Sequence, residues 1–135
     1  MDPEHRLEGI EEILEELDMM PDSTIILVEG INDKKALTAL GIRKRMIAVQ
    51  SEGGPLRASE KVYEMKANVV IMTDWDDKGE TIKDELKRNL SSLSVRYDTN
   101  LRSKLGELCV KDIKDIESLP ILHRRLTSET RKGRI

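Results

Sequence analysis

Aromatic residues are almost absent from this chain of 135 residues, which has no Phe, one Trp and two Tyr. We therefore expect a core built from the aliphatic side chains of Ile, Leu, Val, Met and Ala. Cysteine is equally rare. The single residue Cys109 excludes an internal disulfide and any zinc site made of several cysteines, and we expect it to be inert within an apolar helix.

Long apolar runs and a signal peptide are also missing, so we expect a cytoplasmic protein with no membrane partner. Charged residues make up 36% of the chain, and the net charge of −3 conceals an asymmetry. Residues 1–18 are strongly acidic, whereas residues 124–135 are basic. A basic tail can help to hold a polyanion, although a solvated and partly disordered terminus explains it equally well.

Helix and strand patterns alternate along the chain. Asp2 and Pro3 are typical of a helix start, and apolar residues recur at helical spacing as far as Leu17. Uniformly apolar runs indicate buried strands. The expected strands are 24–28, 46–49, 68–73 and a weaker 93–97; the expected helices are 31–40, one from Pro55, 78–90, and an irregular region 100–126 interrupted by Pro120.

This alternation predicts an α/β fold with a parallel sheet of about four strands and helices on both faces. At this length we expect one domain. It would comprise an N-terminal helix (1–20), a core (22–100), a helical extension (101–127) and a basic tail (128–135).

Acidic residues follow two of the expected strands. Glu29 comes directly after the first strand, and Asp74 and Asp76 come after the third. If the strands lie in the order 2-1-3-4, these carboxylates face each other across one strand spacing of about 4.8 Å. Ligation by oxygen alone favours Mg²⁺, with Mn²⁺ as the alternative metal. The simpler explanation, that the aspartates cap the next helix, needs only one of them.

Two stretches resemble the signatures of the Toprim domain. They are Ile26-Leu-Val-Glu-Gly-Ile-Asn-Asp33 and Thr73-Asp-Trp-Asp-Asp-Lys-Gly-Glu80, and the resemblance covers roughly residues 22–100. Bacterial-type primases, type IA and type II topoisomerases, OLD-family nucleases, recombination-repair proteins and the ribonuclease that matures 5S ribosomal RNA share this domain. The first stretch is closest to the maturase-like and small stand-alone archaeal and bacterial members.

The resemblance implies that Asp74 and Asp76 are metal ligands and that Glu29 is a third ligand or the general acid/base. Accessory roles are assigned to a second set of residues: Asp33, Asp77 and Glu80 as outer-shell or second-metal groups, Gly30 and Gly79 as points where the chain turns and a phosphate approaches, and Lys34 and Lys78 as contacts to a nucleic-acid backbone. Trp75 either stacks on a base or packs over the neighbouring helix.

These features predict a Mg²⁺-dependent protein that acts on phosphodiester bonds of RNA or DNA, most simply a nuclease of RNA-processing type. One alternative is a metal- and nucleic-acid-binding subunit that cuts nothing and works within a larger complex. A third, from another class, is a receiver-like domain that accepts a phosphoryl group. The sequence leaves open whether a protein partner or a second copy of the chain is required.

Overall fold

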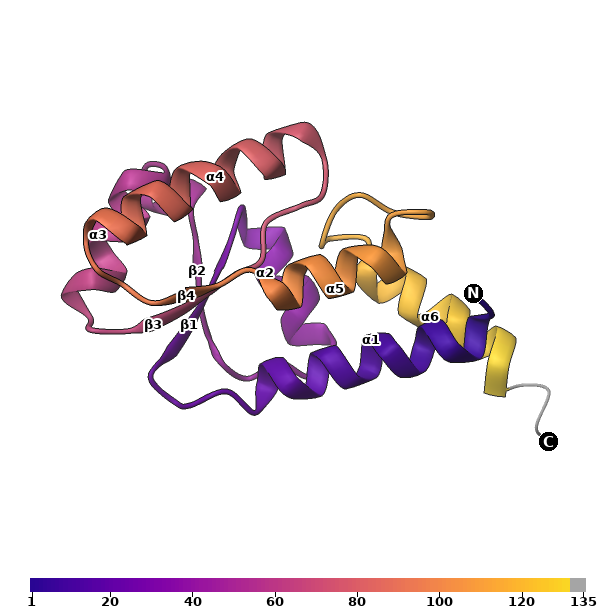
Figure 1. Ribbon diagram of the computed structural model, residues 1–135. Coiled ribbons are helices and arrows are strands. Elements are labelled where there is room, and N and C mark those ends of the chain that lie inside the picture. Colours follow the sequence, from indigo (N-terminus) through magenta and orange to yellow (C-terminus); the bar gives the residue numbers. More distant parts are fainter. Residues whose placement is uncertain (132–135) are drawn as a thin grey trace.

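Four parallel strands form the centre of the protein, whose computed structural model describes residues 1–131. The strands are β1 (Thr24–Val28), β2 (Arg45–Ala48), β3 (Asn68–Ile71) and β4 (Tyr97–Asp98). They are ordered β2-β1-β3-β4, and the register pairs Leu27 with both Ile47 and Ile71. Figure 1 shows the strands in the middle of the molecule, with helices above and below them. The predicted α/β class, strand order and parallel arrangement are therefore confirmed.

Helices cover both faces of this sheet. One face packs against α1 (Pro3–Asp18), α2 (Ile31–Ala39), α5 (Asn100–Cys109) and α6 (Leu119–Arg131); the other packs against α3 (Pro55–Glu64) and α4 (Asp77–Ser92). Alternate residues of β1 serve the two sides, because successive side chains of a strand point to opposite faces. Ile26 and Val28 join the first core, and Ile25 and Leu27 join the second.

The first helix follows its sequence pattern closely. Asp2 accepts a hydrogen bond from the backbone N–H of His5 at 2.8 Å, and Pro3 occupies the first helical position. The buried residues of α1 are those of the predicted apolar stripe: Leu7, Ile10, Ile13, Leu14 and Leu17. Packing of this stripe against α5 and α6 joins the two ends of the chain in one core.

The C-terminal half corrects three expectations. Pro120 does not interrupt a helix but lies in the first turn of α6, where a missing N–H costs nothing; the interruption is the segment 110–118. The fourth strand begins at Tyr97 rather than residue 93, because the chain leaves α4 through a left-handed residue, Ser94, with φ of 58°. The first four residues of the predicted tail, 128–131, continue α6, and residues 132–135 lie outside the described part of the chain.

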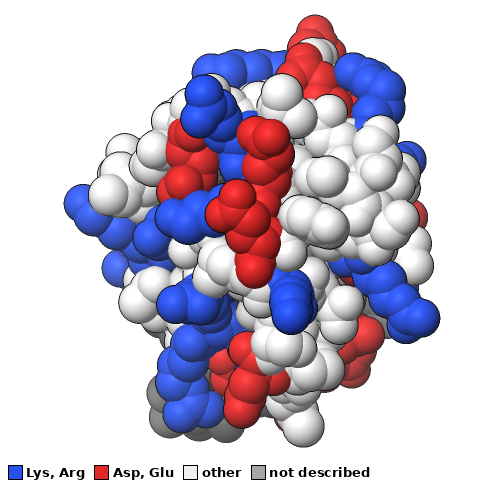
Figure 2. Space-filling model, turned by 90° about the vertical axis from the view of Figure 1, so that its left-hand side faces the viewer, with Lys and Arg blue, Asp and Glu red and all other residues white. Residues whose placement is uncertain are grey.

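Cys109 is fully buried at the end of α5, and burial raises the pKa of its thiol to about 12, as expected for an inert cysteine. Among the helices of residues 1–131, none combines the length and apolar character needed to cross a bilayer. Lys and Arg side chains alternate with Asp and Glu on the face shown in Figure 2, so that face carries no field of a single sign.

Candidate metal centre

Three carboxylates converge where β1 and β3 end. These strands are neighbours, and the N–H of Met72 still donates to the carbonyl of Leu27 at 2.8 Å, just beyond the last paired strand residues. Glu29 is the first residue after β1, and Asp74 and Asp76 lie in the loop that follows β3. One oxygen from each of these three side chains lies within 4.8 Å of the other two.

Backbone N–H groups hold each carboxylate in place. Glu29 is 4% exposed, and its Oε2 accepts a hydrogen bond from the N–H of Asp74 at 2.7 Å. Asp74 Oδ1 accepts from the N–H of Ile116 at 2.9 Å. Asp76 Oδ1 accepts from the N–H of Gly79 at 2.7 Å and so caps α4. Helix capping thus accounts for Asp76 alone and leaves the other two acids unexplained.

The electrostatics of this cluster are unfavourable without a cation. Burial, together with the nearby carboxylates of Glu29 and Asp76, raises the pKa of Asp74 to about 7 against the lowering effect of the hydrogen bond from Ile116. Burial also raises the pKa of Asp33 to about 6, helped by the charge of Asp74. A bound cation would favour the ionised form of carboxyl groups whose pKa is raised in this way.

The carboxylates open onto a pocket of about 300 Å³. Its lining consists of Glu29, Gly30, Ile31, Asn32, Asp33, Gln50, Asp74, Asp76, Lys78 and Glu117. Of the predicted accessory residues, Asp33 and Lys78 therefore line the site, whereas Lys34 and Asp77 lie outside this lining. Asp33 has a further task, because it accepts a hydrogen bond from the N–H of Gly30 at 2.9 Å at the start of α2.

Glu80 is not part of the cluster. Its carboxylate accepts hydrogen bonds from Arg102 and Lys83, both at 2.7 Å, and these bonds hold its pKa below the usual range, that from Lys83 having the larger effect. Its predicted role as an outer-shell or second-metal group remains a prediction, and the structure places it as the counter-ion of two cations.

Gly79 is needed for close packing rather than for a turn, whereas an added Cβ at Gly30 would be crowded only by the end of the Gln50 side chain. A Cβ at Gly79 would lie 2.0 Å from the carbonyl oxygen of Asp74, and one at Gly30 would lie 3.0 Å from Gln50 Oε1. Gly30 has an extended backbone with φ of −138°, and the residues with positive φ do not include Gly79. The tight contact at Gly79 lets α4 begin directly beside Asp74.

Trp75 packs against α5. Its indole Nε1 donates to the carbonyl of Arg102 at 3.0 Å, and a Cβ at Gly106 would lie 2.7 Å from that nitrogen. The backbone N–H of Trp75 donates to the carbonyl of Lys114 at 2.8 Å. Of the two interpretations of Trp75, packing over a neighbouring helix is the one that the structure supports.

Sequence reasoning missed the contributions of the C-terminal segment. The N–H of Ile116 donates to Asp74, Glu117 lines the pocket, and the buried Arg102 donates to the carbonyls of Thr73 and Asp74. No local motif marks these residues, since each contact joins positions 28 or more residues apart.

The donor set fits a hard divalent cation. Around an octahedral Mg²⁺, oxygens lie about 3 Å apart when adjacent and about 4.2 Å apart when opposite, so three oxygens within 4.8 Å of one another can reach one ion by moving closer together. The cluster contains neither nitrogen nor sulfur ligands, which favours Mg²⁺ or Mn²⁺ over zinc.

Fold and site together define an α/β protein with an acidic cluster at the carboxyl edge of a 2-1-3-4 sheet, as in metal-dependent proteins of nucleic-acid metabolism. The family model of the Toprim domain matches residues 24–108. This chain belongs to the Toprim domain family, whose members generally bind divalent metals and nucleic acid.

Relatives resemble the chain over most of its length. A UPF0292 protein of Methanosarcina acetivorans is 32% identical over 126 residues, which are 93% of this chain and 87% of the relative. A UPF0292 protein of Methanosarcina barkeri is 36% identical over 84% of this chain and 80% of its own length. The solved structure of a putative protein from Aquifex aeolicus is 34% identical, covers 80% of this chain and 95% of its own, and superposes with a TM-score of 0.67.

Proposed function

We propose that this protein is a Mg²⁺- or Mn²⁺-dependent nuclease that hydrolyses phosphodiester bonds, with RNA as its first substrate class. The observation that carries the proposal is the convergence of Glu29, Asp74 and Asp76 at the end of β1 and β3 within a Toprim domain. When bound there, a divalent cation would neutralise phosphate charge, orient the attacking oxygen and stabilise the leaving oxygen.

The chain's own residues have separable tasks in this proposal. Asp74 and Asp76 hold the cation, each already oriented by a backbone N–H. Glu29 completes the ligand set or moves a proton between water and the leaving oxygen, since it is the most buried of the three acids. Lys78, the one cation of the pocket lining, contacts a phosphate of the strand as it enters.

One observation favours a second candidate, a binding subunit that holds nucleic acid without cutting it. The pocket lining has a single lysine against five acids, so the free protein offers little attraction for a polyanion. Such a subunit would depend on the metal for retention and on a partner, or a second copy, for any chemistry.

The test is to incubate the purified protein with structured RNA, single-stranded RNA and DNA, with Mg²⁺, with Mn²⁺ and with EDTA. We expect metal-dependent cleavage that Glu29→Gln and Asp74→Asn each abolish, with a loss of roughly a thousandfold or more. Retention of labelled strands without cleavage would establish the binding subunit instead.

Asp22→Asn is the matched control. This substitution also removes one carboxylate, but Asp22 lies before β1, at the opposite end of the sheet, and pairs only with Lys44 at 3.2 Å among the ion pairs of the described residues. Cleavage should be unchanged in this variant. Equal losses in Asp22→Asn and Asp74→Asn would mean that the assay reports net charge and not a metal centre.

A further inference from the structure

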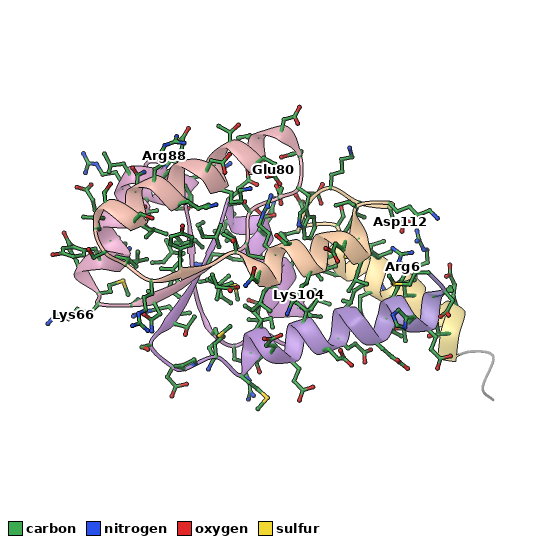
Figure 3. The ribbon with its side chains drawn as sticks, in the orientation of Figure 1. Arg6, Lys66, Glu80, Arg88, Lys104 and Asp112 are labelled. Atoms are coloured by element: carbon green, nitrogen blue, oxygen red, sulfur yellow. The ribbon has the colours of Figure 1, made fainter. Side chains whose placement is uncertain are left out.

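A buried arginine contacts the loop of residues 72–76 between β3 and α4, the metal loop, from a position outside the two signatures. The side chain of Arg102, on α5, is only 3% exposed. Its Nε donates to the carbonyl of Thr73 at 2.9 Å, and its Nη2 donates to the carbonyl of Asp74 and to Glu80 Oε1, the latter at 2.7 Å. One guanidinium thus joins the end of β3 to the first turn of α4 (Glu80 is labelled in Figure 3).

The hydrogen bonds of the sheet do not extend through the loop that Arg102 contacts. Residues 72–76 lie between β3 and α4, and the bond from Met72 to Leu27 is the last backbone bond between β1 and β3 in the described part of the chain. Two metal-ligand candidates, Asp74 and Asp76, project from this loop. A bound ion tolerates little error in ligand position, so something other than the sheet must orient the peptides between them.

We propose that Arg102 is a positioning residue that holds the 73–76 loop in its cation-binding conformation. The inference rests on the proposed metal site and adds a residue that lies outside both signature motifs. Asp74 is fixed at three atoms: its N–H by Glu29, its Oδ1 by Ile116, and its carbonyl by Arg102. The bond from Arg102 holds the carbonyl of the peptide that leads from Asp74 to Asp76, and the N–H of that peptide, on Trp75, donates to the carbonyl of Lys114.

The chemistry of the guanidinium suits this task. Arginine presents several N–H donors in a rigid plane, so one side chain can serve two carbonyls and a carboxylate at once. Glu80 supplies the counter-charge, and therefore the ligand carboxylates remain available for a cation. A lysine would offer a single point of attachment and would lose at least one of the two carbonyls.

The test compares Arg102→Met and Arg102→Lys with the wild-type protein by calorimetric titration with Mn²⁺, well below the unfolding temperature. Arg102→Met keeps most of the buried stem and removes every donor. We expect its dissociation constant for Mn²⁺ to rise roughly 10- to 100-fold, as for other residues that orient metal ligands, and Arg102→Lys to recover part of that loss. If Arg102→Met unfolds, Arg102→Lys carries the comparison.

Arg6→Met is the matched control for loss of a partly buried guanidinium that binds a backbone carbonyl. Arg6 donates twice to the carbonyl of Leu108, at 3.0 and 2.8 Å, and pairs with Asp112, away from the metal loop (Figure 3). This variant should lose thermal stability but keep the wild-type affinity for Mn²⁺. Wild-type affinity in folded Arg102→Met or Arg102→Lys would overturn the proposal, as would an equal loss in Arg6→Met.

Trp75 separates this inference from the metal site itself. It is the only tryptophan of the chain and lies within the loop, so its near-UV circular dichroism and its fluorescence report the loop without any metal. If the wild-type protein takes up no Mn²⁺, the proposed function fails, and the Trp75 signal still tests the positioning role. A signal altered by Arg102→Met and not by Arg6→Met supports that role; a signal unchanged in both rejects it.

Discussion

The two edges of the sheet carry charge in opposite ways. At the carboxyl edge, a pocket of about 300 Å³ is lined by five acids and one lysine. At the amino edge, a pocket of about 310 Å³ is lined by Lys66 and Arg96, and none of the described residues in its lining is acidic. The two pockets are similar in volume, so the difference between them is chemical and not one of size.

The contrast extends to how the charges are compensated. Lys66 and Arg88, labelled in Figure 3, lie on the side that Figure 2 views, where residues of both signs alternate at the surface. Asp22, before β1, is fully exposed beside Lys44. At the carboxyl edge, by contrast, Glu29 and Asp33 are nearly buried among like charges. Water and paired ions compensate the charges at one edge, whereas at the other the buried carboxylates must take up protons or a cation.

Gly79→Ala, at the carboxyl edge, should have the largest effect on stability and metal binding of any single substitution considered. The added Cβ would lie 2.0 Å from the carbonyl oxygen of Asp74, which is backbone and cannot swing aside. We expect the free energy of unfolding to fall by about 3 kcal/mol and the affinity for Mn²⁺ to be lost. Urea denaturation and calorimetric titration measure the two effects.

Gly41→Ala gives the corresponding test at the amino edge. Gly41 precedes β2 and has φ of 94°, with no atom within 4 Å of an added Cβ. Only the left-handed backbone opposes this substitution, so the loss should be about 1 kcal/mol, with Mn²⁺ binding unchanged. Equal losses of stability in the two variants would contradict the steric account of Gly79.

The contrast also explains which parts of the molecule the sequence could reveal. Apolar strands that alternate with helices predicted the parallel sheet, and the two signatures located Glu29, Asp74 and Asp76 at its carboxyl edge. These features depend on neighbours in the chain or on the register of adjacent strands, which periodicity and motif spacing encode.

The remaining parts of the site depend on contacts between distant residues. Arg102 contacts residues 22 to 29 positions away, and Ile116 contacts Asp74 over 42 positions. In the sequence, residues such as these look like any other arginine or isoleucine of an amphipathic helix or loop. The accessory role suggested for Glu80 illustrates the limit, because nothing in its local sequence reveals the buried arginine that it faces.

The stability of the metal-free protein should depend on pH through the acids of the carboxyl edge. Asp74 and Asp33 have pKa values of about 7 and about 6 when folded, above the ordinary value of 3.8. The folded state therefore binds protons more tightly than the unfolded chain, and its stability is greatest below pH 4 as far as these groups are concerned. In EDTA, the free energy of unfolding should fall by about 2 kcal/mol as the pH rises from 4 to 7, after allowance for solvent screening.

Two comparisons isolate that effect. Asp74→Asn should flatten most of the slope, whereas Asp22→Asn at the amino edge should leave it unchanged. Saturating Mn²⁺ at pH 8 should restore the lost stability in the wild-type protein and not in Asp74→Asn. A metal-free protein whose stability rises between pH 4 and 7 would show that the carboxylates are already compensated within the chain.

The smallest expected effect concerns the one cation of the carboxyl-edge pocket. Lys78 is exposed and lies beside the carboxylates without an ion pair among the described residues. Its positive charge therefore opposes the approach of Mn²⁺. Lys78→Ala should therefore tighten Mn²⁺ binding roughly threefold at low salt, and the gain should vanish at high ionic strength. The double substitution Lys66→Ala and Arg96→Ala removes twice the charge from the amino edge and should leave the affinity unchanged. If both variants tighten binding in proportion to the charge removed, the protein's overall charge governs metal uptake, and the separation between the two edges has no functional consequence.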